Sequence, residues 1–157
     1  MNREIDNSWN EMASNFDAFL IALGRFFKAD SESRIQLIRT GYQKNPRLVV
    51  ELLRYMPESD LKILMPFLLE HARSVHGYLD HFRRAILSLP KDWLLEHIES
   101  SAESILQNGD DDEYRRLLEL YFRIDPQLTR RLAERAVRSP DANIREAGQD
   151  FIEKLKS

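Results

Sequence analysis

Residues 112–155 read DEYRRLLELYFRIDPQLTRRLAERAVRSPDANIREAGQDFIEKL, and this stretch predicts three consecutive helices joined by short turns. In the first helix, large apolar side chains recur at offsets of 0, 3, 4 and 7 residues, which return to one face of an α-helix: Tyr114, Leu117, Leu118 and Tyr121. Asp125-Pro126 and Ser139-Pro140-Asp141 mark the turns, because aspartate caps a helix and proline fits its first position. The third helix repeats the same offsets from Ile144 to Phe151.

The same spacing occurs once more upstream, in the segment that starts at Phe82 and ends at Leu89. Phe82 lies 32 residues before Tyr114, which lies 30 residues before Ile144, and an arginine follows each of the three directly. A helix pair cannot bury its apolar stripe alone, so a period of about 30 residues predicts helix pairs that stack on one another.

The segment Ser139-Pro140-Asp141-Ala142-Asn143-Ile144-Arg145-Glu146-Ala147 resembles the turn and second helix of a HEAT-like, or armadillo-like, repeat. The resemblance is clearest over residues 110–155. It weakens over 76–109, where His76-Gly77 stands in place of the turn aspartate. It implies a right-handed α-α superhelix of antiparallel helix pairs, with a ladder between repeats that joins Asp112 or Asp141 to Arg115 and Arg145. It implies a fold and does not specify an activity.

The remaining sequence extends this all-α prediction to eight or nine helices in a single HEAT-like repeat domain over residues 1–157. Residues 8–29 are expected to form an N-terminal capping helix after a frayed terminus at 1–7. Pro66 lies inside the helix that begins near Pro57, and we expect it either to kink that helix or to split it.

Composition narrows the classes of function. The chain of 157 residues has no cysteine, which excludes disulfides, thiol catalysis and thiolate metal sites. Its net charge of −3 provides no global attraction to nucleic acid or an anionic membrane. No apolar run approaches the length of a membrane span, and the first thirty residues lack the features of a signal peptide. We therefore expect a cytoplasmic protein without membrane contact.

No motif indicates catalysis or a cofactor. His71, His76 and His81 are five residues apart, a spacing that does not place them on one helical face, so we expect no metal site and exposed or capping histidines. The acidic run from Asp110 to Glu113 lacks the alternating ligands of a calcium loop and is better explained as helix capping. These observations favour a non-catalytic protein.

The arginines are the strongest candidates for contact with a partner. Those selected lie at the repeat spacing or on one face of the helix after Pro126: Arg84, Arg116, Arg131, Arg135 and Arg138. One interpretation pairs them with neighbouring acids in surface ion pairs. The other is a cationic stripe that binds phosphate or an acidic peptide. We predict that Arg131, Arg135 and Arg138 are free and that the arginines after the three repeat anchors (Arg83, Arg115 and Arg145) are structural.

The N-terminal helix provides a second candidate surface. An apolar stripe runs from Trp9 to Phe27, while Ile21 and Phe26 lie outside it, so the helix is apolar on more than one side. Either the helix at 32–44 folds over the extra side, which we expect in the monomer, or that side binds another chain or a second copy.

The leading functional hypothesis is therefore a scaffold or protein–protein interaction module that presents a curved helical-repeat surface. The alternative is a HEAT-like protein that binds nucleic acid through the arginine stripe, with base-modifying activity in one version. A third hypothesis, by analogy with the repeat type, is an accessory subunit or lyase that acts on a chromophore protein.

Overall fold

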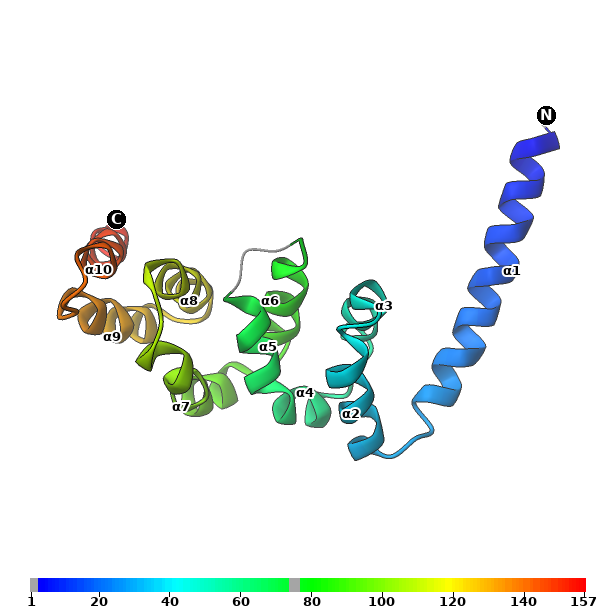
Figure 1. Cartoon of the computed structure of the whole chain (residues 1–157), viewed down its shortest axis with the longest axis horizontal. Coiled ribbons are helices and arrows are strands. Elements are labelled where there is room, and N and C mark those ends of the chain that lie inside the picture. Colours follow the sequence, from blue (N-terminus) through cyan, green and yellow to red (C-terminus); the bar gives the residue numbers. More distant parts are fainter. Residues whose placement is uncertain (1–2, 74–76) are drawn as a thin grey trace. The chain divides into compact units, whose positions relative to one another are not determined.

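The computed structural model describes residues 3–73 and 77–157, and within these ranges the chain is all-α, as the sequence predicts (Figure 1). Ten helices are present there: α1 (Arg3–Phe26), α2 (Ser31–Gly41), α3 (Pro46–Leu52), α4 (Glu58–Ile63), α5 (Met65–Ala72), α6 (Leu79–Leu87), α7 (Lys91–Gln107), α8 (Asp111–Ile124), α9 (Pro126–Val137) and α10 (Ala142–Lys154). The chain divides into two compact units, Met1–Gly41 and Tyr42–Ser157. The single repeat domain over 1–157 stays a prediction.

The first unit contains α1 and α2. The helix α1 begins at Arg3, so most of the segment expected to fray is helical, and it ends at Phe26, three residues before the expected boundary. Acidic Glu4 and Asp6 in the first turn and basic Arg25 in the last turn suit the helix dipole and explain the early start. Asp30 then accepts a hydrogen bond from the backbone N–H of Ser33 at 2.8 Å, in the first turn of α2.

In the second unit, the segment around Pro66 is split into two helices. Leu64 separates α4 from α5. Pro66 lies in the first turn of α5, where its missing N–H costs no helical hydrogen bond, and the N–H of Leu68 resumes the ladder by donating to the carbonyl of Leu64 at 2.9 Å. Because of this split, the described ranges contain ten helices, one more than the upper predicted number.

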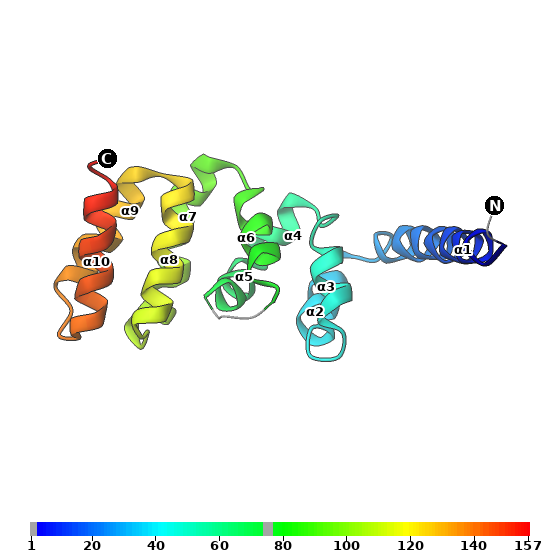
Figure 2. The same ribbon diagram turned by 90° about the horizontal axis from the view of Figure 1, so that it is seen from above.

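The carboxyl-terminal helices of the second unit pack as the apolar spacing predicts. The three repeat anchors are buried, with 0% of Phe82, 6% of Tyr114 and 7% of Ile144 exposed. Figure 2 shows α8 and α10 next to each other, and α10 packs closely on α9 as well. Gly148 permits this approach, since a Cβ atom there would lie 2.6 Å from the carbonyl oxygen of Ala133 on α9.

Aspartates begin these helices, as the turn motifs predict. Asp125 accepts hydrogen bonds from the N–H groups of Gln127 and Leu128, and Asp141 accepts them in the same way at the start of α10. Asp110 and Glu113 form a reciprocal capping box: the N–H of Glu113 donates to Asp110 at 2.9 Å, and the N–H of Asp110 donates to Glu113 at 3.1 Å. The acidic run at 110–113 is therefore a capping element.

Candidate interaction surfaces

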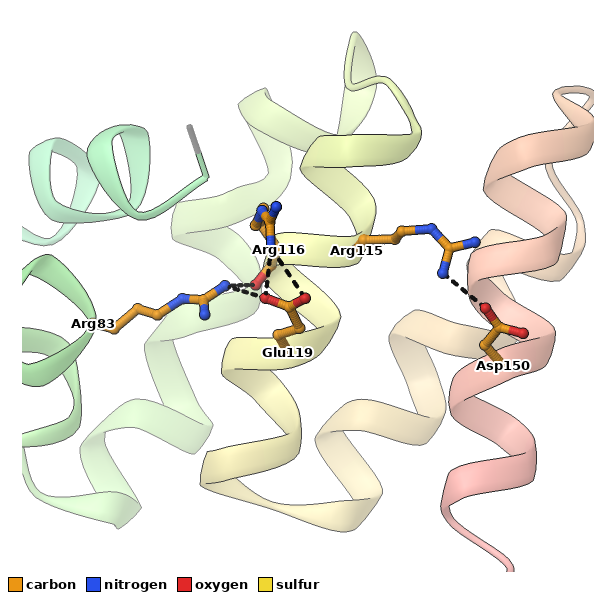
Figure 3. A network of polar contacts seen from close by, with 5 residues as sticks. All are labelled: Arg83, Arg115, Arg116, Glu119 and Asp150. Carbon is orange, nitrogen blue, oxygen red and sulfur yellow. Dashed lines mark hydrogen bonds and ion pairs between the residues drawn. The ribbon is translucent and has the colours of Figure 1, made fainter. Parts of the chain in front are cut away.

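The first arginine after a repeat anchor is structural, as predicted. Arg83 on α6 has only 8% of its side chain exposed and donates to a carboxylate oxygen of Glu119 on α8 at 2.7 Å (Figure 3). It also donates to the carbonyl of Arg116 at 3.1 Å. Glu119 receives a second guanidinium from Arg116 at 3.2 Å. Burial raises the pKa of Glu119, but the hydrogen bonds and charges of the two arginines outweigh it and leave the pKa below its ordinary value.

The arginine after the second repeat anchor makes an equivalent contact two helices further along the chain. Arg115 on α8 donates to Asp150 on α10 at 2.7 Å, and this hydrogen bond raises the pKa of the guanidinium (Figure 3). The HEAT-like resemblance implies that Asp112 or Asp141 pairs with these arginines, and the structure differs. Asp112 makes no ion pair with a described residue, and Asp141 caps its own helix. Arg145 instead donates to the carbonyls of Ser139 and Pro140, at 2.9 and 2.7 Å, in the turn before α10.

The prediction that Arg131 and Arg135 lie free is wrong. Arg131 on α9 makes a bidentate ion pair with Glu99 on α7, at 3.0 and 2.8 Å, and Arg135 makes another with Glu103, at 2.6 and 3.0 Å. The hydrogen bonds raise the pKa of both arginines and lower that of Glu103. Because α7 presents two glutamates one helical turn apart to α9, the guanidinium groups form a neutral row of ion pairs.

Two of the selected arginines remain without an ion pair to any described residue. Arg84 is exposed on α6, and Arg138 is exposed at the end of α9. Arg116 is partly buried and held by Glu119. The cationic stripe is therefore reduced to separated charges, and this removes the observation that supported nucleic-acid binding.

Arg84 lines a surface pocket of about 400 Å³ in the second unit. The pocket lies at α3, α4, α6 and the turn between α3 and α4, and its lining combines apolar side chains such as Leu61 and Ala85 with the polar side chain of Arg54. Arg54, in the turn after α3, is already paired with Glu51 of that helix at 3.0 Å. The pocket can accept an apolar side chain next to an acidic group, with Arg84 as its one unpaired guanidinium among the described residues.

Within residues 3–73 and 77–157, the histidines do not gather into a metal site. His71 is half-buried and stacks on Phe82, and its Nδ1 lies 2.8 Å from the carbonyl oxygen of Phe67, so it is neither exposed nor a cap, in contrast to the prediction. His76 lies outside the described residues. The Nδ1 atom of His81 is buried without a hydrogen-bond partner. No group of three or more metal-ligating side chains occurs among the residues that the structure describes.

The helix α1 exposes a long row of apolar side chains. The exposed fractions are 65% for Ile5, 68% for Trp9, 59% for Met12, 58% for Phe16 and 43% for Leu20. Trp9 and Phe16 are large side chains that helices of globular proteins bury as a rule. Nothing within the first unit covers this row, which makes α1 the strongest candidate for contact with another chain.

The second apolar side of α1, which carries Ile21, is not covered by the following helix as predicted. Ile21 is 60% exposed, so the expected covering of that side by the following helix is wrong. That helix, α2, is only 11 residues long and begins after the turn that ends in Asp30. Phe26 is half-buried, with its ring edge-to-face against Phe27 at 5.1 Å between centroids.

Sequence reasoning overlooked two features of these surfaces. The first is the pair Glu99 and Glu103, which lie 32 residues before their arginine partners. This interval equals the spacing of the first two repeat anchors and could have identified them. The second is Ile5, assigned to the frayed terminus, although its distance of four residues from Trp9 continues the apolar row.

No protein-family profile, curated protein or solved structure matches the chain. None of the helices in the described ranges is both long and apolar enough to cross a membrane.

Proposed function

We propose that the chain is a non-catalytic, HEAT-like interaction module that binds another protein through the exposed apolar row of α1. The single observation that carries the proposal is the exposure of Trp9 and Phe16, at 68% and 58%, on one helix of 24 residues. Exposed apolar surface of this kind is typical of a binding interface, because its burial against a partner is favourable.

The ion pairs of the second unit support the repeat part of this proposal. Arg83 and Arg115 connect α6 to α8 and α8 to α10, while Arg131 connects α9 to α7. Alternate helices are thus joined in two rows, an arrangement that suits stacked helix pairs. These contacts also lead us to prefer a protein partner to nucleic acid, because Arg131 and Arg135 of the proposed stripe are paired with glutamates within the chain.

A photo-crosslinking experiment in cells tests the proposal. The benzophenone amino acid p-benzoylphenylalanine replaces either Phe16 on the apolar row or Ser14, which lies about half a turn away on the exposed opposite side of α1. Irradiation should give a product heavier than the 18.5 kDa chain for the Phe16 position and none for Ser14. Equal products at both positions, or none at either, would refute binding through the apolar row.

A further inference from the structure

The pocket beside Arg84 is formed within the second unit by two kinds of surface. One side of α6, continued at the end of that helix, supplies four residues at offsets of 0, 3, 4 and 7, which return to one helical face: His81, Arg84, Ala85 and Ser88. The apolar part of the lining comes from α3, α4 and the turn between them: Val50, Leu53, Met56 and Leu61. Cationic and apolar groups therefore meet at one pocket.

Arg84 is available to a ligand. Its side chain is exposed and makes no ion pair with a described residue, although Asp80 lies four residues earlier on the same helix. The second guanidinium, of Arg54, uses only its Nη1 atom in the pair with Glu51. No acidic side chain is among the described residues that line the pocket, so Arg84 gives the pocket a positive charge that the lining does not compensate.

His81 provides a second hydrogen-bonding group on the same side of α6. Its ring makes no hydrogen bond with a described residue, and its Nδ1 atom is buried, which leaves Nε2 as the nitrogen that a ligand can reach. Residues three apart on a helix are neighbours, at about 5–6 Å between Cβ atoms. A carboxylate can therefore accept from the Arg84 guanidinium with one oxygen and from the His81 Nε2–H with the other.

From these groups we infer that the pocket binds a small organic acid, with one carboxylate on a short apolar chain. The carboxylate lies at Arg84 and His81, and the chain contacts the apolar residues of α3, α4 and their turn. The inference goes beyond the proposed function, because this site belongs to the second unit and does not involve α1.

The apolar part of the pocket selects a short chain. Its side chains belong to the packed core, with exposed fractions from 3% for Leu53 to 7% for Met56. They offer little further area to a ligand, so most of a long alkyl chain would stay in water, where it gains nothing. The volume of about 400 Å³ also lies near the low end of small-ligand sites, which span about 300–1,000 Å³. An acid of the size of butyrate matches both properties.

The charge of the pocket selects a single carboxylate. A guanidinium presents a planar fork of N–H groups that matches the two oxygens of a carboxylate. One uncompensated guanidinium balances one negative charge. Inorganic phosphate carries more than one charge at neutral pH, and sites for phosphate groups use clusters of arginines. A monocarboxylate is therefore the better match to Arg84.

An NMR titration of the full chain with sodium butyrate, up to about 20 mM, tests the inference. The backbone N–H signal of Ala85, which lies between the pocket residues of α6, reports binding. It should shift with a dissociation constant of about 1 mM, since a ligand of so few atoms can make only a few contacts. Butyramide has nearly the same shape without the charge and should bind at least about tenfold more weakly. Sodium chloride at equal ionic strength is the blank.

Three variants assign the contacts. Arg84→Gln should weaken butyrate binding by about tenfold or more, because the charge-assisted hydrogen bonds are lost. His81→Phe keeps a ring, removes both nitrogens and should weaken binding several-fold. The matched control is Arg138→Gln, which removes the other selected arginine without an ion pair to a described residue and should bind like the wild type. Circular dichroism should show unchanged helicity for Arg84→Gln and Arg138→Gln, since both side chains are exposed.

Any of three results would overturn the inference: no saturable shift in the wild type, equal binding of butyramide, or undiminished binding by Arg84→Gln. Tighter binding of inorganic phosphate than of butyrate would overturn the carboxylate class. The peptide acetyl-glycyl-glycyl-valine carries the same carboxylate on the apolar end of a chain. If it binds more than about tenfold tighter than butyrate, the pocket is a site for a protein terminus and the free acid is overturned.

Discussion

The substitution Glu119→Gln tests whether the ion pair between Arg83 on α6 and Glu119 on α8 stabilises the packing of these two helices. Glu119 binds two guanidinium groups, of Arg83 at 2.7 Å and of Arg116 at 3.2 Å, and the first belongs to a side chain that is 8% exposed (Figure 3). An amide of the same shape can still accept a hydrogen bond, but it removes the negative charge. The variant therefore keeps a buried cation and loses the charge that compensates it.

The expected loss of stability follows from the burial of the two partners. Removing one member of a fully buried ion pair costs about 3–5 kcal/mol. The side chain of Glu119 is 36% exposed, so water screens part of the interaction, and Arg83 keeps its hydrogen bond to the carbonyl of Arg116. We expect the free energy of unfolding to fall by about 2 kcal/mol at pH 7. At about 2–4 °C per kcal/mol for a chain of this size, the melting temperature should fall by roughly 4–8 °C.

The loss of stability caused by Glu119→Gln should be larger at neutral pH than in acid. Because the pKa of Glu119 is lower in the folded state than its ordinary value of 4.5, the carboxylate stabilises the fold above that value. This contribution is lost as the pH falls through the folded-state pKa, where Glu119 becomes protonated and resembles glutamine. The difference in unfolding free energy between the wild type and Glu119→Gln should therefore be full at pH 7 and vanish in acid.

Urea unfolding followed by circular dichroism across a pH series measures this difference. Glu134→Gln is the matched control, since Glu134 is an exposed glutamate on α9, and it should change stability by less than about 0.5 kcal/mol. Adding Arg83→Met to Glu119→Gln should recover part of the loss, because the buried cation is then gone. A loss that is equal at pH 7 and in acid would show that packing, and not the ion pair, is responsible.

Three further substitutions test the contacts of the carboxyl-terminal helices. Arg131→Glu should lower the free energy of unfolding by about 1 kcal/mol at low salt and less at high salt, and adding Glu99→Arg should restore it; an unchanged urea midpoint would mean that the pair does not form in solution. Gly148→Ala places a Cβ atom 2.6 Å from a backbone oxygen of α9 and should cost about 1–3 kcal/mol, whereas Gly24→Ala, in open space, should be neutral or stabilising. Phe151→Ala should cost about 3–5 kcal/mol by calorimetry, because that side chain is only 3% exposed, and a loss below about 1 kcal/mol would contradict its place in the core.

Local features of the sequence predict the helices and their ends well. The stripe that begins at Tyr114 is buried, and Asp125 caps α9 next to Pro126. Both signals act within a few residues of the chain, so they do not depend on which helices become neighbours. The boundary at Leu64 was harder to predict, because a proline in the first turn of a new helix and one that kinks a longer helix have the same local sequence.

The ion pairs depend on the relative register of helices that are far apart in the chain. The presence of Arg131 and Arg135 predicts only that an acidic group lies near each of them. Several exposed acidic residues are closer to these arginines in the sequence than Glu99 and Glu103 are. The choice is made by the packing of α9 beside α7, which depends on the apolar contacts of the whole stack. A charged helical face therefore cannot be classified as open or neutralised from its own residues.

The ion pairs between α7 and α9 and those of Arg83 and Arg115 differ in the sequence distance between their partners, and the repeat length explains this difference. The pairs between α7 and α9 are 32 residues apart, which equals the interval from Phe82 to Tyr114, so equivalent turns face each other. The pairs of Arg83 and Arg115 are 36 and 35 residues apart, four or five more than the interval to the next anchor, or about one helical turn. An arginine in this row thus reaches an acid one turn further along the next repeat. Arg145 on α10 departs from this row, because it donates to the carbonyls of Ser139 and Pro140 in the turn before its own helix.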